Sequence, residues 1–119
     1  MRKILALFTL AALCLLPMTA LADEGPLSLP ESASAEAKKH NDEGIQHWGE
    51  GHYDVALKHF MAASKADASS GEIHFNEAIA LDKLGKHGDA VTHFKAAKEH
   101  AGGNEKITSS PILNKHLSH

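Results

Sequence analysis

Residues 51–63 read GHYDVALKHFMAA, and residues 85–97, 34 positions further on, read GKHGDAVTHFKAA. Laying residues 37–70 on residues 71–104 without a gap gives nine identities, where chance in an alanine-rich chain gives about three. The identical pairs are His40 and His74, Glu43 and Glu77, Ile45 and Ile79, Gly51 and Gly85, Ala56 and Ala90, His59 and His93, Phe60 and Phe94, Ala62 and Ala96, and Ala63 and Ala97. The chain therefore contains an internal repeat of 34 residues.

The shared residues predict a pair of helices in each repeat. Ala56, Phe60 and Ala63 are four and three residues apart, so they lie on one side of a helix, and Gly51 stands where a turn would precede it. Residues 35–101 are rich in alanine and have no proline, which favours helix throughout. Each repeat is predicted to be a helix hairpin.

Glycines predict where the helices end. Four helices are expected between residues 35 and 101, and a short last helix is expected to begin with Ser110 as N-cap and Pro111 in its first turn. The glycines assigned to the four helix ends are Gly49 and Gly51, then Gly71, then Gly85 and Gly88, and finally Gly102 and Gly103.

The 34-residue unit resembles the tetratricopeptide repeat, in which a small residue in the first helix is followed by glycine, tyrosine, alanine, phenylalanine and alanine. These positions hold Gly44, Gly51, Tyr53, Ala56, Phe60 and Ala63 in the first repeat, and Ala78, Gly85, Ala90, Phe94 and Ala97 in the second. The sequence departs from the family at His87 (the turn tyrosine), at Glu43 and Glu77 (a leucine), and at Ala68 and Gly102 (a terminal proline).

The resemblance implies an all-α fold in residues 35–104, with two tandem helix-turn-helix repeats at 37–70 and 71–104 and a short capping helix in 105–119. In the family, the first helices of successive repeats line a concave face that binds a protein or peptide. The residues that the resemblance places on this face are Asn41, Ile45, Trp48, Phe75, Ile79 and Asp82. Because stable repeat arrays usually contain about three units, self-association is a further expectation.

The start of the chain predicts a signal peptide over residues 1–22. Two basic residues precede the apolar run 4–16, which is too short for a permanent membrane-spanning helix. Ala20 and Ala22 are the small residues that a signal peptidase reads, so cleavage is expected before Asp23. The protein is therefore expected to be periplasmic or secreted, with no membrane contact once the signal is removed.

Residues 23–34, DEGPLSLPESAS, are predicted to be a flexible leader without fixed structure, because they contain two prolines and no helical apolar period. The only cysteine, Cys14, would leave with the signal peptide. Lipid attachment at Cys14 is the alternative, but Leu13 precedes it where that signal needs a small residue.

Charge and motif content exclude several classes of function. Without Arg2 and Lys3 the chain has 10 basic and 15 acidic residues, a net charge of −5, which argues against nucleic acid as a partner. The sequence has no HExxH pair, no glycine-rich phosphate loop and no serine in an elbow context. We expect a protein that is not an enzyme.

Ten histidines suggest a second use for the scaffold, the binding of copper, nickel or zinc. Pairs such as His40 and His47 are seven residues apart, about 10.5 Å along a helix, so no such pair holds one ion alone. Carboxylates come closer, since Glu43 lies three and four residues from these two histidines. The candidate ligands are His40, Glu43, His47, His52, His59, His87, His93 and His100.

Packing is the rival explanation of the histidines. His40, His47 and His74 occupy repeat positions where large packing side chains are usual, whereas His59 and His93 precede core phenylalanines and are expected to face outward. Only His116 and His119 have chelating spacing, and they lie at the chain end. The histidine spacing of GHYDVALKH and KHGDAVTH is also similar to that of histidine-rich small metal-binding proteins of bacterial periplasms. Two hypotheses result: an exported interaction module first, and a metal-buffering protein as the alternative.

Overall fold

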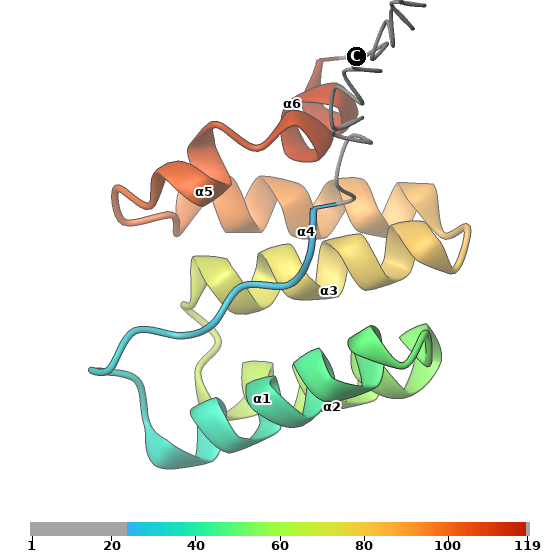
Figure 1. Cartoon of the computed structure of the whole chain (residues 1–119). Helices are drawn as coiled ribbons and strands as arrows, with labels where there is room; N and C mark the ends of the chain where they lie inside the picture. The colour runs from blue at the N-terminus through green and yellow to red at the C-terminus, as the bar shows by residue number, and fades with distance from the viewer. Residues whose placement is uncertain (1–23, 119) are drawn as a thin grey trace, which may run out of the picture.

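The computed structural model describes residues 24–118 (Figure 1). The expected signal peptide, Cys14, Asp23 and His119 lie outside these described residues. The helices are α1 (Ala35–Gly49), α2 (Tyr53–Ala66), α3 (Gly71–Lys83), α4 (His87–Glu99), α5 (Glu105–Thr108) and α6 (Pro111–Leu117). The described part of the chain contains no strand and no helix that is long and apolar enough to cross a membrane.

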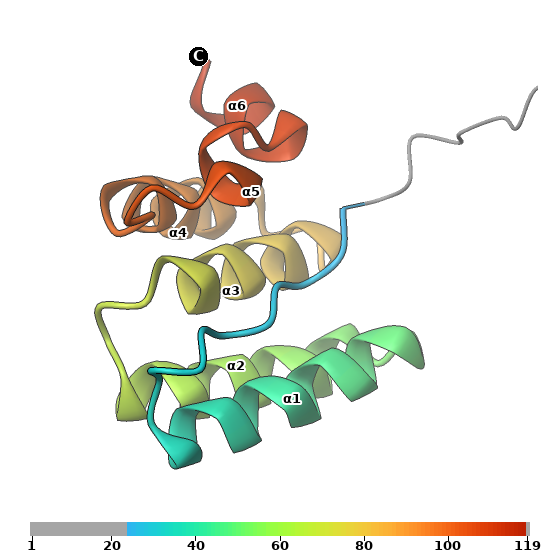
Figure 2. The same ribbon diagram turned by 60° about the vertical axis from the view of Figure 1, so that its left-hand side comes forward.

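The helices pack in tandem pairs, α1 against α2 and α3 against α4. The two pairs meet where α2 packs against α3, and α6 packs against α4. The prediction of an all-α fold with two helix-turn-helix repeats and a short C-terminal capping helix is therefore confirmed (Figures 1 and 2). The turns of the two hairpins also match, because Gly51 and Gly85 have positive φ angles of 77° and 76°, a conformation that favours glycine.

Serine side chains cap the first turns of three helices, α1, α3 and α6. The hydroxyl oxygens of Ser34, Ser70 and Ser110 accept hydrogen bonds from backbone N–H groups in the first turns of α1, α3 and α6, which satisfies donors that have no partner inside the helix. Pro111 begins α6 as predicted, because its fixed φ suits the first turn and it has no N–H to leave unpaired.

Two of the predicted helix ends are wrong. Gly71 begins α3, while α2 ends earlier at Ala66. A Cβ atom at Gly71 would overlap the backbone carbonyl of His100, so the glycine allows α3 to start against the end of α4. Gly88 lies in the first turn of α4 and ends no helix, and the one-turn helix α5 was not predicted.

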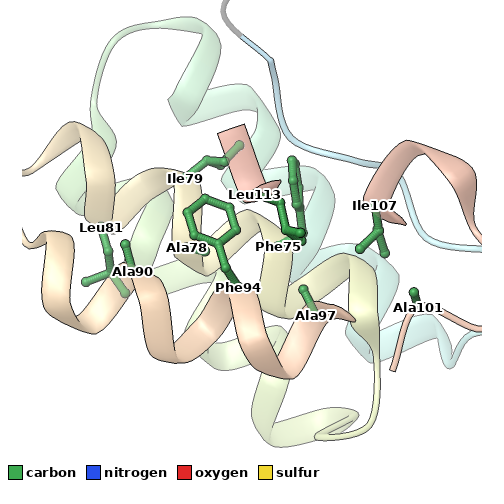
Figure 3. Packing of buried hydrophobic residues seen from close by; sticks show 10 residues of the cluster. All are labelled: Phe75, Ala78, Ile79, Leu81, Ala90, Phe94, Ala97, Ala101, Ile107 and Leu113. Carbon is green, nitrogen blue, oxygen red and sulfur yellow. The ribbon is translucent and has the colours of Figure 1, made fainter. Parts of the chain in front are cut away.

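The core follows the repeat identities. Phe60 and Phe94 are fully buried, and the small side chains next to them let the helices approach closely. The repeated alanines that are fully buried are Ala56, Ala63, Ala90 and Ala97. Figure 3 shows Phe94 among Phe75, Ile79 and Leu113, so that the capping helix completes the core of the second repeat.

Residues 24–34 precede α1, and we call them the N-terminal strap. The prediction that this segment is a leader without fixed structure is wrong. The strap lies across α3 and α1 (Figures 1 and 2). The Leu27 N–H donates to Asn76 Oδ1 at 2.7 Å, and the Leu27 carbonyl accepts from Asn41 Nδ2 at 2.9 Å and Asn76 Nδ2 at 2.8 Å. The two buried amides thus satisfy both backbone polar groups of Leu27.

Candidate metal sites

The strap covers part of the concave face implied by the repeat resemblance, because Leu27 contacts Asn41 and packs against the core cluster that contains Phe75 and Ile79. Asn41 is fully buried, and Phe75 and Ile79 are 1 % exposed, while Ile45, Trp48 and Asp82 are half-buried. Asn76 Nδ2 also donates to Asn41 Oδ1 at 2.7 Å, which closes a buried amide network around Leu27. Phe75 and Ile79 therefore serve the core, and the face is not an open groove.

The nine described histidines gather in three groups, identified by distances between ring centroids. In the first repeat, His59 lies 6.4 Å from His40 and 5.1 Å from His47, which lies 6.0 Å from His52. In the second, His74 lies 5.7 Å from His93 and 6.0 Å from His100. His87 and His116 form the third group at 6.2 Å. Folding thus brings together histidines that are far apart in the sequence.

A carboxylate lies among the histidines of the first repeat. His40 and Glu43 share a face of α1 because they are three residues apart, and the Nδ1 atom of His40 is 3.6 Å from Glu43 Oε2. From α2, His59 places its Nδ1 atom 3.0 Å from the same oxygen. We call His40, Glu43 and His59 the first triad.

The second repeat contains the equivalent set, 34 residues on. His74 and Glu77 lie on α3, and the Nδ1 atom of His93, on α4, is 3.1 Å from Glu77 Oε2. We call His74, Glu77 and His93 the second triad. In each triad, one potential ligand atom from each residue lies within 4.8 Å of those from the other two.

Several ligand atoms in the triads are buried without a hydrogen-bond partner, namely His40 Nδ1, His74 Nδ1 and Glu77 Oε1. The tautomer of His74 follows from its other nitrogen, Nε2, which lies 2.8 Å from the Ala68 carbonyl oxygen. A carbonyl only accepts, so Nε2 carries the hydrogen and Nδ1 of the neutral ring has a bare lone pair. A backbone carbonyl that fixes the imidazole in this way is usual beside a metal ligand.

Burial changes the proton chemistry of the second triad. It raises the pKa of Glu77 to about 7, although a hydrogen bond with Ser64 acts in the opposite direction. Burial also lowers the pKa of His93, as does the neighbouring His74, while Asp89 raises it. Both shifts favour the uncharged forms of the acid and the imidazole. A cation that binds here at neutral pH meets a neutral ring and displaces a proton from a carboxyl group.

Two further groups combine histidine with a carboxylate. His47 and His52 face Glu50, with Nδ1 to Oε2 distances of 3.7 and 3.2 Å, on an exposed surface beside the first triad. The Nδ1 atom of His47 is also buried and unpartnered. The other group joins Asp82 to His87 and His116.

The structure places seven of the eight predicted metal ligands in these four groups and leaves His100 outside, stacked on His74. His59 and His93 do not face outward as expected; they are half-buried and turn toward the first helix of their own repeat. The potential ligands that were not among the predicted ones are Glu50, His74, Glu77, Asp82 and His116. His74 and Glu77 were visible in the repeat identities, since each matches a predicted ligand 34 positions earlier.

Comparison of the sequence with models of known protein families gives no match, and comparison with curated protein sequences gives none either.

Proposed function

We propose that this protein binds divalent transition-metal ions, namely zinc, copper or nickel, through the first and second triads. The observation that carries the proposal is the repetition of one donor set. Each repeat supplies two imidazoles and one carboxylate at equivalent positions, and each has a buried imidazole nitrogen without a partner. Packing alone would explain buried rings, but it gives no reason for unpartnered ring nitrogens.

The donor chemistry fits these ions. Imidazole nitrogen suits zinc, copper and nickel, and a carboxylate oxygen completes a three-residue set that zinc accepts with nitrogen and oxygen bonds of about 2.0–2.2 Å. A buried polar atom without a partner costs about 1–3 kcal/mol. A bound ion removes that cost at His40 and His74, so metal binding stabilises the fold as well as filling the sites.

Two sites in a small protein that is predicted to be exported suit the buffering of metal ions rather than catalysis. The triads offer three protein ligands each and leave a coordination position to water, which is also the arrangement of catalytic zinc sites. An ion held by three ligands leaves more readily than one in a closed four-ligand site, which suits buffering. The sequence has no HExxH pair, no glycine-rich phosphate loop and no serine in an elbow context. We therefore propose a binding protein and no enzymatic reaction.

Titration of the tag-free protein with zinc tests the proposal. We expect saturable binding at pH 7.5 with at least two equivalents at micromolar or tighter affinity, measured by calorimetry. The double variant His59→Gln/His93→Gln should lose two equivalents, and His100→Gln, which alters a neighbouring ring outside the triads, should lose none. Equal stoichiometry in the wild type and the double variant would contradict the proposal.

A peptide-binding module on a tetratricopeptide-like scaffold is the second candidate, and the strap itself favours it. An extended chain already lies across α3 and α1, held through the peptide groups of Leu27 by Asn41 and Asn76. A partner segment of similar shape would have to displace the strap. A synthetic peptide EGPLSLPESAS should then bind the variant Asn76→Ala less well than the wild type, with Trp48 fluorescence as the readout. Absence of any fluorescence change would argue against exchange.

A further inference from the structure

We propose that Asp82, His87 and His116 form a separate metal site that fastens the capping helix α6 to the α3–α4 hairpin. The inference rests on the proposed metal-binding function, because the ion belongs to the same class of divalent transition metals. It uses no residue of either triad, and its role is to hold the C-terminal segment in place.

The three side chains come from three helices and meet at one carboxylate oxygen. Asp82 lies near the end of α3, His87 is the first residue of α4, and His116 lies on α6. The Oδ1 atom of Asp82 is 2.7 Å from His87 Nδ1 and 2.9 Å from His116 Nε2. The side chains of Asp82 and His116 are 21 % and 13 % exposed, while His87 is largely open to solvent. An ion can therefore enter from the side of His87.

The hydrogen bonds of His116 show why a cation belongs here. Its Nδ1 atom lies 2.8 Å from the Ile112 carbonyl oxygen, which only accepts, so Nδ1 carries a hydrogen. In the neutral ring Nε2 then has a bare lone pair, and it faces the carboxylate of Asp82 at 2.9 Å. Two acceptors in this position repel each other unless a metal ion or a second proton on the ring lies between them.

A metal ion meets this requirement without moving the backbone. Bonds of about 2.0–2.2 Å from one ion to a nitrogen and an oxygen place those two atoms about 2.8–3.5 Å apart at bond angles of about 90–110°. The 2.9 Å between His116 Nε2 and Asp82 Oδ1 therefore requires at most a small side-chain shift. The Ile112 carbonyl fixes the tautomer that presents Nε2 to the ion. The ring of Phe94 lies 4.8 Å from that of His116 and supports its orientation from the core.

The charges that surround the group include one more carboxylate. Glu24 and Lys115 line the same cavity as Asp82, His87 and His116. The carboxylate of Glu24 accepts hydrogen bonds from Ser110 Oγ at 2.6 Å and from the Ile112 N–H at 2.8 Å. The strap therefore holds the start of α6, while the ion would hold its end. The ammonium group of Lys115 opposes a cation, but it is exposed to solvent, whereas both carboxylates are half-buried.

The test uses a background without the triads. In His59→Gln/His93→Gln we expect zinc to slow amide hydrogen exchange in residues 111–117 by at least tenfold, with no comparable change in α1, and calorimetry to show binding that persists. Adding His116→Gln should abolish the zinc-dependent slowing in residues 111–117. Asp82→Asn is the second variant, used if His116→Gln unfolds the cap, and it should have the same effect.

The outcomes separate this inference from the proposed function. If the wild type and His59→Gln/His93→Gln bind the same number of zinc equivalents but zinc still protects α6, the triads are not metal sites and this site stands. If zinc fills the triads while exchange in residues 111–117 is the same with and without zinc, the inference is overturned and the cation beside His116 is a proton.

Discussion

The first and second triads have the same residues at the same repeat positions, yet they differ in burial. The Glu43 side chain is 37 % exposed, whereas that of Glu77 is 4 % exposed. The cause is the order of the helices, because α2 packs against α3 and so covers the second triad, whereas the described chain has no helix before α1 to cover the first. One donor set thus has two different environments, an open one and a buried one.

The largest expected effect is the loss of zinc from one triad at a time. His59→Gln should remove the first triad and His93→Gln the second, each with a fall in affinity of about a thousandfold or about 4 kcal/mol at that site, because each change removes a direct ligand. Calorimetric titration of the two single variants measures this. If either variant still bound zinc at both triads, the replaced histidine would not be a ligand and the two triads would not be equivalent.

The next largest effect is on the free energy of unfolding in the absence of metal, and we expect it only for substitutions in the second triad. The pKa of Glu77 is raised from 4.5 to about 7, so the folded state holds a proton that the unfolded state loses above pH 4.5. The stability from this protonated form is complete below pH 4.5 and is lost as pH rises through about 7. At pH 8 the buried carboxylate is charged.

Glu77→Gln should therefore raise the free energy of unfolding at pH 8 by up to about 3 kcal/mol, with the gain vanishing near pH 4. The matched change Glu43→Gln, at an exposed side chain, should stay within about 0.5 kcal/mol at both pH values. Urea unfolding in the presence of a chelator gives both numbers. Equal effects of the two substitutions would show that the helix α2 does not bury Glu77 as described.

A smaller effect is expected where the repeats differ in the core. A Cβ atom at Gly44 would overlap the ring of the fully buried Phe60, whereas the equivalent Ala78 is accommodated beside the second core. We expect Gly44→Ala to destabilise the protein by about 1–2 kcal/mol, because forced repacking outweighs the gain in helix propensity of about 1 kcal/mol. Stabilisation in urea unfolding would mean that the first core is as roomy as the second.

The sequence predicted the parts of the fold that local patterns determine. The 34-residue offset located both hairpins and their turns at Gly51 and Gly85, and Ser110 with Pro111 located the last helix, because capping and turn chemistry act within a few residues. It did not predict the strap, whose fixed conformation depends on Asn76, 49 residues away from Leu27. A segment with two prolines and no helical period has no local signal for that contact.

The candidate sites were also predicted only in part: contacts between ligands on one helix were found, and contacts that form through tertiary packing were not. Helical spacing predicts that His40 and Glu43 lie close together. His59 joins them only through the packing of α2 on α1, which spacing along one helix does not reveal. His116 was set aside as a residue at the chain end, yet α6 carries it to Asp82 on α3. Ligands that meet through tertiary packing are visible in a single sequence only when, as for His74 and Glu77, a repeat duplicates them.

The smallest effect concerns the protons that zinc releases. Zinc must displace the proton of Glu77, whose pKa is about 7. Zinc binding to the variant His59→Gln, which keeps the second triad, should therefore release most of a proton from this group at pH 6 and little at pH 8. His93 adds less than an ordinary histidine would, because its pKa is lowered. Calorimetry in buffers of different ionisation heats measures the release, and Glu77→Gln in the same background should remove the part due to the carboxyl group. A release that does not change between pH 6 and pH 8 would mean that zinc binds without the Glu77 carboxylate, and the buried triad would then be a pair of histidines.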